Sequence, residues 1–146
     1  MRIGDTHHRA IRRDEGGGVR VIDQTRLPHR FETIRLDSAD DAAHAIRTMI
    51  VRGAPLIGAT AAYGIALAMR DDTSDTALAA ACAHLGATRP TAVNLAWAIE
   101  RVRGALMNTP RAERVERAFT EADAICEEDV DRCRRIGEHG LTLIEE

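Results

Sequence analysis

An arginine, a glycine and a proline stand directly before an almost wholly apolar helical segment at residues 56–69, in the stretch Arg52-Gly53-Ala54-Pro55. Proline is favoured at the first position of a helix, because its missing N–H has no partner there anyway. The N–H groups that follow are unpaired at the positive end of the helix dipole, and Arg52 adds a planar, permanently charged group that matches phosphate. Gly53 lets the backbone approach a ligand closely. The stretch predicts a phosphate site; the alternative is a turn before a buried helix, with Arg52 paired to a carboxylate.

A second segment repeats this arrangement. Arg89 and Pro90 precede a helical pattern that runs from about residue 92 to residue 107. If the two helix starts face a common point, Arg52 and Arg89 bind one phosphate from two sides, and each charge-assisted contact contributes roughly 1.5 to 3 kcal/mol. We therefore expect both arginines to belong to a single anion site.

The composition is that of an ordinary globular protein, with 146 residues, 45% of them hydrophobic and 29% charged. The net charge of −3 and the isoelectric point near 6.1 supply no general attraction for nucleic acid or an anionic membrane, so a bound anion must be held by local geometry. All 20 basic residues are arginine, which removes Schiff-base lysine chemistry from the options within this chain.

The cysteines and the apolar segments favour the cytoplasm. The sequence begins without an apolar core of signal-peptide length, and its most hydrophobic segment spans only about 15 residues. Cys126 and Cys133 are seven residues apart on a predicted helix, about 10.5 Å along its axis, which is too far for a disulfide. With Cys82 they are expected to be reduced.

Neither a metal site nor a complete catalytic apparatus is indicated. His7 and His8 are neighbours in an N-terminal stretch expected to be mobile, and the other histidines lack the spacings of zinc ligands. The acidic run at residues 127–131 is interpreted as a solvated helix face balanced by nearby arginines, and Trp97 as a core residue. The sequence therefore predicts ligand binding, but it contains no evident nucleophile, general base or metal site for catalysis.

The chain is predicted to have an α+β fold. Three strands of a small antiparallel sheet are expected in residues 1–37, and residues 38–146 have mostly helical periodicity. The strands are expected at residues 10–13, 19–23 and 31–36, and five helices at residues 38–51, 56–69, 75–86, 92–107 and from 111 nearly to the end.

Two helices of this predicted bundle are unusual. The second helix is apolar all round and contains Gly58 and Gly64, so it is expected to lie at the centre of the domain. The last helix carries an apolar stripe as far as Ile144, with no following element to cover it. We therefore expect residues 1–146 to be the N-terminal domain of a longer protein whose remainder is absent.

Five ordered motifs closely resemble the N-terminal part of the methylthioribose-1-phosphate isomerase family, and the likeness extends over the chain from about Ile3. Ribose-1,5-bisphosphate isomerases and the regulatory subunits of the translation-initiation exchange factor share some of the pattern, but the two arginine-proline motifs favour the sugar-phosphate isomerases. The motifs are Asp23–Pro28, Val51–Gly58, Ala61–Gly64, Ala87–Leu95 and Ile136–Gly140.

The resemblance implies a small N-terminal domain followed by a larger Rossmann-like α/β domain. It implies conversion of 5-methylthioribose 1-phosphate to 5-methylthioribulose 1-phosphate in methionine salvage, by a homodimer without metal or organic cofactor. The family pattern transfers substrate binding to Arg52, Gly53, Ala54 and Arg89.

The catalytic groups of this family lie in the larger domain, on a cysteine within a threonine-histidine-cysteine-asparagine segment and on an aspartate. Neither segment occurs in this chain, so we expect no catalytic residue here and no activity from the chain alone. Two alternatives remain open: a non-catalytic assembly or regulatory domain related to the exchange-factor subunits, and a ribose-1,5-bisphosphate isomerase.

Overall fold

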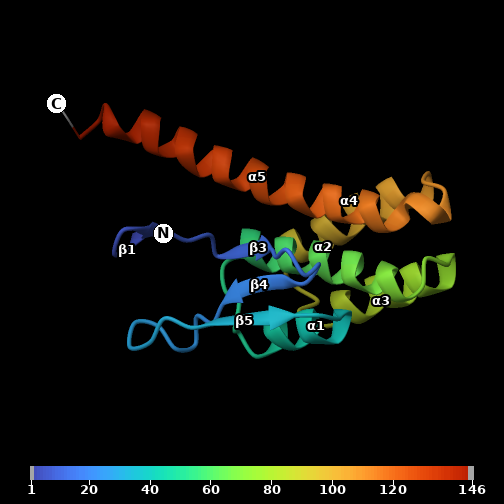
Figure 1. Ribbon diagram of the computed structural model, residues 1–146. Helices are drawn as coiled ribbons and strands as arrows, with labels where there is room; N and C mark the ends of the chain where they lie inside the picture. The colour runs from blue at the N-terminus through green and yellow to red at the C-terminus, as the bar shows by residue number, and fades with distance from the viewer. Residues whose placement is uncertain (1, 145–146) are drawn as a thin grey trace.

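The computed structural model describes residues 2–144 and confirms the α+β class: a three-stranded antiparallel sheet and five helices (Figure 1). A short 3₁₀ turn at Arg111–Glu113 precedes the last helix. The strands are β1 (Arg2–Ile3), β2 (Thr6–His7), β3 (Ile11–Arg13), β4 (Val19–Ile22) and β5 (Thr33–Leu36), and the helices are α1 (Ala39–Arg47), α2 (Ala54–Asp71), α3 (Asp75–Gly86), α4 (Val93–Met107) and α5 (Arg114–Leu141).

The sheet has the order β3-β4-β5 and turns one apolar face to the helices. Ile11 pairs with Val21, and Val19 pairs with Leu36. These four side chains are buried, whereas the arginines that alternate with them are half-buried or exposed. The alternating and β-favouring runs of the sequence therefore located all three strands to within two residues.

Strands β1 and β2 form a separate hairpin that the sequence prediction missed. His7 lies in β2, and the ring of His8 packs against Phe31 with 4.7 Å between ring centroids. The expectation of a mobile stretch at these histidines was therefore wrong. Two-residue strands carry too little alternation to be recognised from sequence.

Helix α1 begins as predicted and ends earlier. The Ser38 hydroxyl accepts the N–H of Asp41, whose carboxylate accepts the N–H of Ser38 in return, which forms a capping box. The helix stops at Arg47 rather than near Val51, because Met49 adopts a positive φ of 61°. This left-handed residue turns the chain toward the start of α2.

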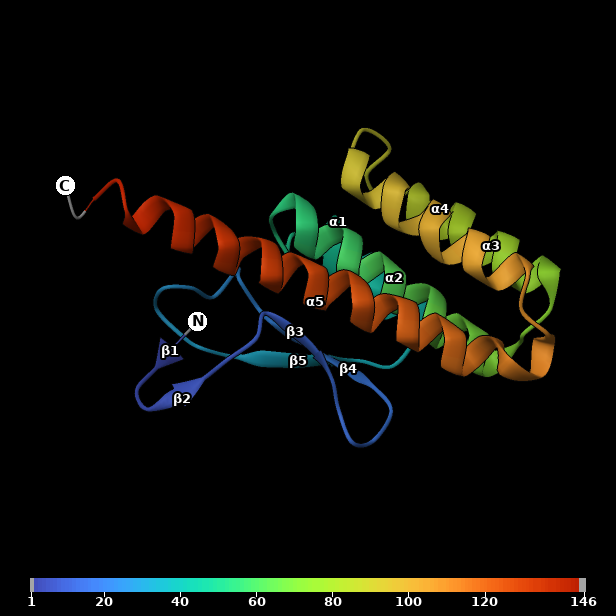
Figure 2. The same cartoon turned by 90° about the horizontal axis from the view of Figure 1, so that it is seen from above.

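Helix α2 lies at the centre of the fold, as predicted, and contacts every other helix as well as β3 (Figures 1 and 2). Its glycines explain the close packing. A Cβ at Gly64 would lie 2.9 Å from the Cβ of Ala42 in α1, and one at Gly58 would lie 2.8 Å from the backbone oxygen of Asn94 in α4. Side chains larger than hydrogen would force these helices apart.

Helix α5 packs on the fold with its first half only. Phe119 and Ala122 are buried, but Ile136 and Leu141 are 66% and 51% exposed, and the helix extends beyond the other elements (Figure 1). The 28 residues of α5 span about 42 Å. Within residues 2–144, nothing covers the far end of the apolar stripe that the sequence predicted.

Two carboxylates of the acidic run connect α5 to other elements. Glu127 forms an ion pair with Arg9, and Glu128 binds Arg101 of α4 with both oxygens at 2.7 Å. The interpretation of this run as a solvated face was therefore incomplete, because sequence spacing shows only the arginines on the same helix.

Trp97 is 47% exposed and Val93 is 79% exposed, so the prediction that Trp97 belongs to the core was wrong. Helix α4 buries a neighbouring stripe against α2 and α5, which includes Leu95, Val102 and Leu106.

No helix in the described part of the chain has both the length and the apolarity needed to cross a membrane.

Candidate functional site

The start of α2 has the features of an anion-binding helix terminus. Gly53 is the N-cap with a φ of 93°, a conformation that L residues rarely adopt, and it has no side chain to cap the helix. The N–H of Ile57 donates to the oxygen of Gly53 at 3.0 Å. Within residues 2–144, the N–H groups of Ala54 and Leu56 have no acceptor, and Pro55 has no N–H.

Pro55 is the second residue of α2 rather than the first as predicted, since Ala54 opens the helix. This shift leaves two unpaired N–H groups instead of a run of three. They still lie at the positive end of an 18-residue helix dipole, so the local attraction for an anion is retained.

The segment before α2 is held by backbone hydrogen bonds from two directions. The N–H of Val51 donates to the oxygen of Ala45 in α1 at 3.3 Å, and the N–H of Gln24 donates to the oxygen of Ile50 at 2.9 Å. Val51 is fully buried, whereas Arg52 next to it is exposed. The Gln24 bond shows one role of the Asp23–Pro28 motif, which is to anchor the segment that carries Arg52.

Arg89 lies in a turn before α4 rather than at the helix start itself. The N–H of Ala92 donates to the oxygen of Arg89 at 3.0 Å, which closes a turn with Pro90 at its second position. Helix α4 then begins at Val93, and Ala92 provides no side-chain cap. A second uncapped helix N-terminus therefore follows the Arg89 turn.

The two helix starts are neighbours. Helices α2 and α4 run side by side with their N-terminal ends at the same end of the bundle (Figure 2). The close approach of Gly58 to Asn94 joins their first turns, and these two residues line a cavity of about 30 Å³ together with Pro55 and Trp97. The sequence motifs at both starts therefore occupy one region of the surface.

Both arginines are exposed, and neither guanidinium makes a hydrogen bond or ion pair with residues 2–144. Most arginines described on this surface do have a carboxylate or carbonyl partner, such as Arg101 with Glu121 and Glu128. The alternative in which Arg52 pairs with a carboxylate is not supported here. The arrangement leaves Arg52 and Arg89 available to a ligand anion.

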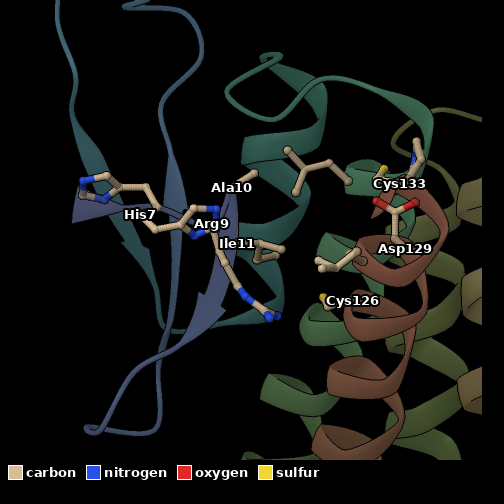
Figure 3. A pocket seen from close by; sticks show the side chains of 12 residues that line it. His7, Arg9, Ala10, Ile11, Cys126, Asp129 and Cys133 are labelled. Carbon is tan, nitrogen blue, oxygen red and sulfur yellow. The ribbon is translucent and has the colours of Figure 1, made fainter. Parts of the chain in front are cut away.

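A larger pocket of about 370 Å³ flanks the start of α2 on its other side (Figure 3). One wall is the chain from His7 to Ile11, the opposite wall is α5, and the floor includes Leu56 and Ala59 from the first two turns of α2. Sequence reasoning missed this pocket, since its two walls lie more than 100 residues apart in the chain and neither wall carries a motif that the sequence analysis used.

The charges around this pocket are paired. Arg9 binds Glu127, and Asp129 lies 3.5 Å from Arg132 on the same helix. Cys126 faces the pocket from α5, and burial raises the pKa of its thiol to about 11, so the sulfur is neutral near pH 7. The pocket wall therefore combines neutral sulfur and aliphatic groups with closed ion pairs.

Behind Cys126 lies a buried tyrosine. The Tyr63 hydroxyl donates to Asp123 Oδ1 at 2.5 Å, and burial is the main cause that raises the pKa of Tyr63 far above its usual range. Burial also raises the pKa of the Cys82 thiol to about 11. These groups are held in their protonated forms, which suits packing rather than nucleophilic attack.

Among residues 2–144 there is no group of three or more histidine, cysteine, aspartate or glutamate side chains arranged to hold a metal ion. The predicted binding positions Arg52, Gly53 and Ala54 are contiguous at one helix start, and Arg89 lies in the turn that precedes the neighbouring helix. The described surface of this α+β domain therefore brings together two uncapped helix starts and two arginines without carboxylate partners among residues 2–144.

Residues 50–146 match the model of the initiation factor 2 subunit family, and the chain belongs to this family. It is 58% identical to the methylthioribose-1-phosphate isomerase of Methylorubrum populi over the whole chain, which corresponds to 40% of that protein. The chain thus spans about two fifths of the length of the curated isomerases that it matches.

Two solved structures share the fold. The delta subunit of translation initiation factor eIF-2B from A. fulgidus is 42% identical, with a TM-score of 0.84 over 92% of this chain and 41% of its own. The 5-methylthioribose 1-phosphate isomerase from Pyrococcus horikoshii is 34% identical, with a TM-score of 0.82 over 90% of this chain and 39% of its own.

Proposed function

We propose that this chain forms the N-terminal, phosphate-binding portion of an aldose–ketose isomerase that converts 5-methylthioribose 1-phosphate to 5-methylthioribulose 1-phosphate in methionine salvage. The observation that carries the proposal is the start of α2, where unpaired Arg52 stands beside the free N–H groups of Ala54 and Leu56. The identity of 56–58% to proteins named as this isomerase supports the choice of substrate in this proposal.

In this proposal the sugar's phosphate is bound by Arg52 and the two N–H groups at the start of α2, while Gly53 keeps the approach open. Arg89 binds the same phosphate from the start of α4. Each contact to the phosphate is charge-assisted, so each is stronger than a neutral hydrogen bond. The phosphate thereby becomes the fixed point from which the rest of the sugar is oriented.

The chemical step requires more than these groups. A phosphate on the anomeric oxygen prevents spontaneous ring opening, so a positioned acid and base must open the ring or move hydrogen between C1 and C2. The resemblance assigns those groups to a larger α/β domain, so we expect residues 1–146 alone to be inactive. We propose that the whole enzyme is a cytoplasmic homodimer that uses no metal or organic cofactor and binds neither nucleic acid nor a membrane.

A second function is favoured by one observation. The eIF-2B delta subunit from A. fulgidus superposes with a TM-score of 0.84 at 42% identity, which is as close a fold match as the isomerase structure. A non-catalytic assembly or regulatory domain is therefore the alternative. In that case the exposed Arg52 contacts a protein partner, and a sugar phosphate does not bind.

A chimera tests the proposal. Residues 1–146 replace the matching 40% of the Methylorubrum populi isomerase, and ketose formation from 5-methylthioribose 1-phosphate is measured. We expect an active chimera whose kcat/KM falls about 10- to 100-fold on Arg52→Ala, because a lost charge-assisted contact of roughly 1.5 to 3 kcal/mol corresponds to that factor.

Arg47→Ala is the matched control, since Arg47 is also exposed and makes no side-chain hydrogen bond or ion pair within residues 2–144. A folded but inactive chimera, or equal effects of the two substitutions, would refute the proposal. Circular dichroism of each variant establishes that the fold is retained.

A further inference from the structure

The Asp23–Pro28 motif makes none of the proposed phosphate contacts, and it forms a turn directly after β4. The side chain of Asp23 is only 12% exposed, and its Oδ1 atom accepts two hydrogen bonds from Thr25, one from the N–H at 2.9 Å and one from the hydroxyl at 2.6 Å. A carboxylate that accepts the N–H two residues ahead closes a turn with its own side chain. The amide of Gln24 lies inside this closed ring, so the direction of its N–H is fixed.

Gln24 links this turn to the segment that carries Arg52. Its N–H donates to the oxygen of Ile50 at 2.9 Å, two residues before Arg52. The chain between α1 and α2 contains two residues with left-handed backbone, Met49 with a φ of 61° and Gly53 with a φ of 93°. The bond from Gln24 reaches this segment from outside both flanking helices. Because Gly53 restricts its own backbone very little, the direction of Arg52 depends on contacts on its N-terminal side.

We propose that Asp23 and Thr25 are positioning residues for phosphate binding: the turn that they close holds the backbone before Arg52 and so directs its guanidinium toward the phosphate. The inference rests on the proposed function and deepens it. The side chain of Arg52 makes no hydrogen bond or ion pair within residues 2–144, so its placement depends on its backbone. A group held in its binding position beforehand loses less conformational freedom when the ligand arrives.

The turn at the other end of β4 provides a matched comparison. The side chain of Asp14 is 13% exposed there, and its Oδ1 atom accepts the N–H of Gly18 at 2.9 Å. This turn contacts the opposite end of α2, since Nη1 of Arg70 donates to the oxygen of Gly17 at 2.8 Å. Arg70 lies in the last turn of α2, about 24 Å along the axis from the first residue of the helix. The two carboxylates are alike in burial and in bonding, but only Asp23 is linked to the proposed site.

The test compares the chimera carrying Asp23→Ala with the chimera carrying Asp14→Ala. KM and kcat for 5-methylthioribose 1-phosphate are measured, together with Tm. We expect Asp23→Ala to raise KM about three- to tenfold and to change kcat less than about twofold, because a displaced phosphate contact weakens ground-state and transition-state binding alike. Asp14→Ala should lower Tm to a similar degree and leave both kinetic constants within about twofold of their original values.

Two milder variants separate positioning from loss of the fold. Asp23→Asn keeps an oxygen that accepts the N–H of Thr25, so its KM should stay within about twofold of the unsubstituted chimera. Thr25→Val removes the hydroxyl bond at nearly constant size and should raise KM about two- to fourfold. If Asp23→Asn raised KM as much as Asp23→Ala, the hydrogen-bonded turn would not be the cause.

A double-mutant cycle identifies Arg52 as the group that the turn positions. In the Arg52→Ala background, Asp23→Ala should change KM less than about twofold, because the positioned group is already gone. An undiminished effect of Asp23→Ala in that background would overturn the positioning role. Equal effects of Asp23→Ala and Asp14→Ala on KM would do the same.

Other outcomes bear on the proposed function instead. A folded but inactive chimera, or an Arg52→Ala variant with unchanged constants, would refute the phosphate site, and the positioning role would fail with it. A large effect of Arg52→Ala beside no effect of Asp23→Ala and Thr25→Val would retain the phosphate site and overturn the positioning role alone.

Discussion

Gly58 determines how closely the starts of α2 and α4 approach, so Gly58→Ala is the most informative single substitution. A Cβ at this position would lie 2.8 Å from the backbone oxygen of Asn94 and 3.4 Å from the Cβ of Ala98. A backbone oxygen cannot rotate away, so α4 must shift. Overpacking of this kind costs about 1 to 3 kcal/mol.

The substitution also has a favourable term, because alanine in place of a helical glycine stabilises by roughly 0.5 to 1 kcal/mol. Gly104→Ala measures this term separately, since a Cβ at Gly104 in α4 has nothing within 4 Å. The difference between the two variants therefore isolates the overpacking. A gap of about 2 kcal/mol corresponds to roughly 4 to 8 °C in Tm for a chain of this size.

Urea and thermal unfolding followed by circular dichroism give both free energies. We expect Gly104→Ala to be slightly more stable than the unsubstituted chain and Gly58→Ala to be less stable. In the chimera, Gly58→Ala should also raise KM more than Gly104→Ala, because it moves the turn that carries Arg89 relative to Arg52. If the two variants are equally stable, the close contact between α2 and α4 is not as described.

Three further predictions concern ionisable groups. Hydrogen bonds from the backbone N–H groups of Asp37 and Ser38 lower the pKa of Asp41. Its contribution to stability is therefore present above the unfolded pKa near 3.9 and is lost as pH falls through the lower folded pKa. Asp41→Asn should reduce the pH dependence of the free energy of unfolding, measured with urea, between about pH 5 and pH 2. Exposed Cys133 should react with iodoacetamide at pH 8 well before Cys82 and Cys126, because burial raises the pKa of those two thiols to about 11. Mass spectrometry after digestion gives the order in which the three cysteines are labelled. Labelling of all three at the same rate would contradict the burial of Cys82 and Cys126. Because the pKa of Tyr63 is raised in the folded protein, its contribution to stability is complete below the unfolded pKa near 10 and declines above it. The tyrosinate absorbance of this single tyrosine should therefore appear together with the loss of helical circular dichroism as pH rises. Tyrosinate absorbance in the folded protein would exclude the buried hydrogen bond to Asp123.

Periodicity alone was sufficient for most of the fold. The α3 boundaries at Asp75 and Gly86 are those predicted, and α2 was placed at the centre because its apolar residues surround the helix. The pattern failed where tertiary contacts decide exposure. Trp97 continues an apolar row on α4, yet the neighbouring row with Leu95 packs against the fold, and sequence spacing does not distinguish the two.

The candidate site was partly accessible to sequence reasoning. Arg52 and Gly53 stand in a local motif with a physical purpose, so their place at a helix start followed from helix chemistry. The convergence of the two helix starts was only a hypothesis from the paired motifs, because their close contact depends on the absence of a side chain at Gly58. The pocket beside Leu56 was invisible, since a cavity between a strand segment and a helix far along the chain has no sequence signature.

The central position of α2 also has a kinetic consequence. Helix α2 is enclosed by the other helices and β3, and most of its side chains from Ile57 to Met69 are buried. Its amide protons are therefore expected to exchange with solvent deuterium only through global opening, whereas those near Ile136 exchange through local fraying. The segment that carries Arg52 is thus attached to the element expected to exchange most slowly. Local fraying of α5 near Ile136 therefore leaves α2, and with it the position of Arg52, unchanged.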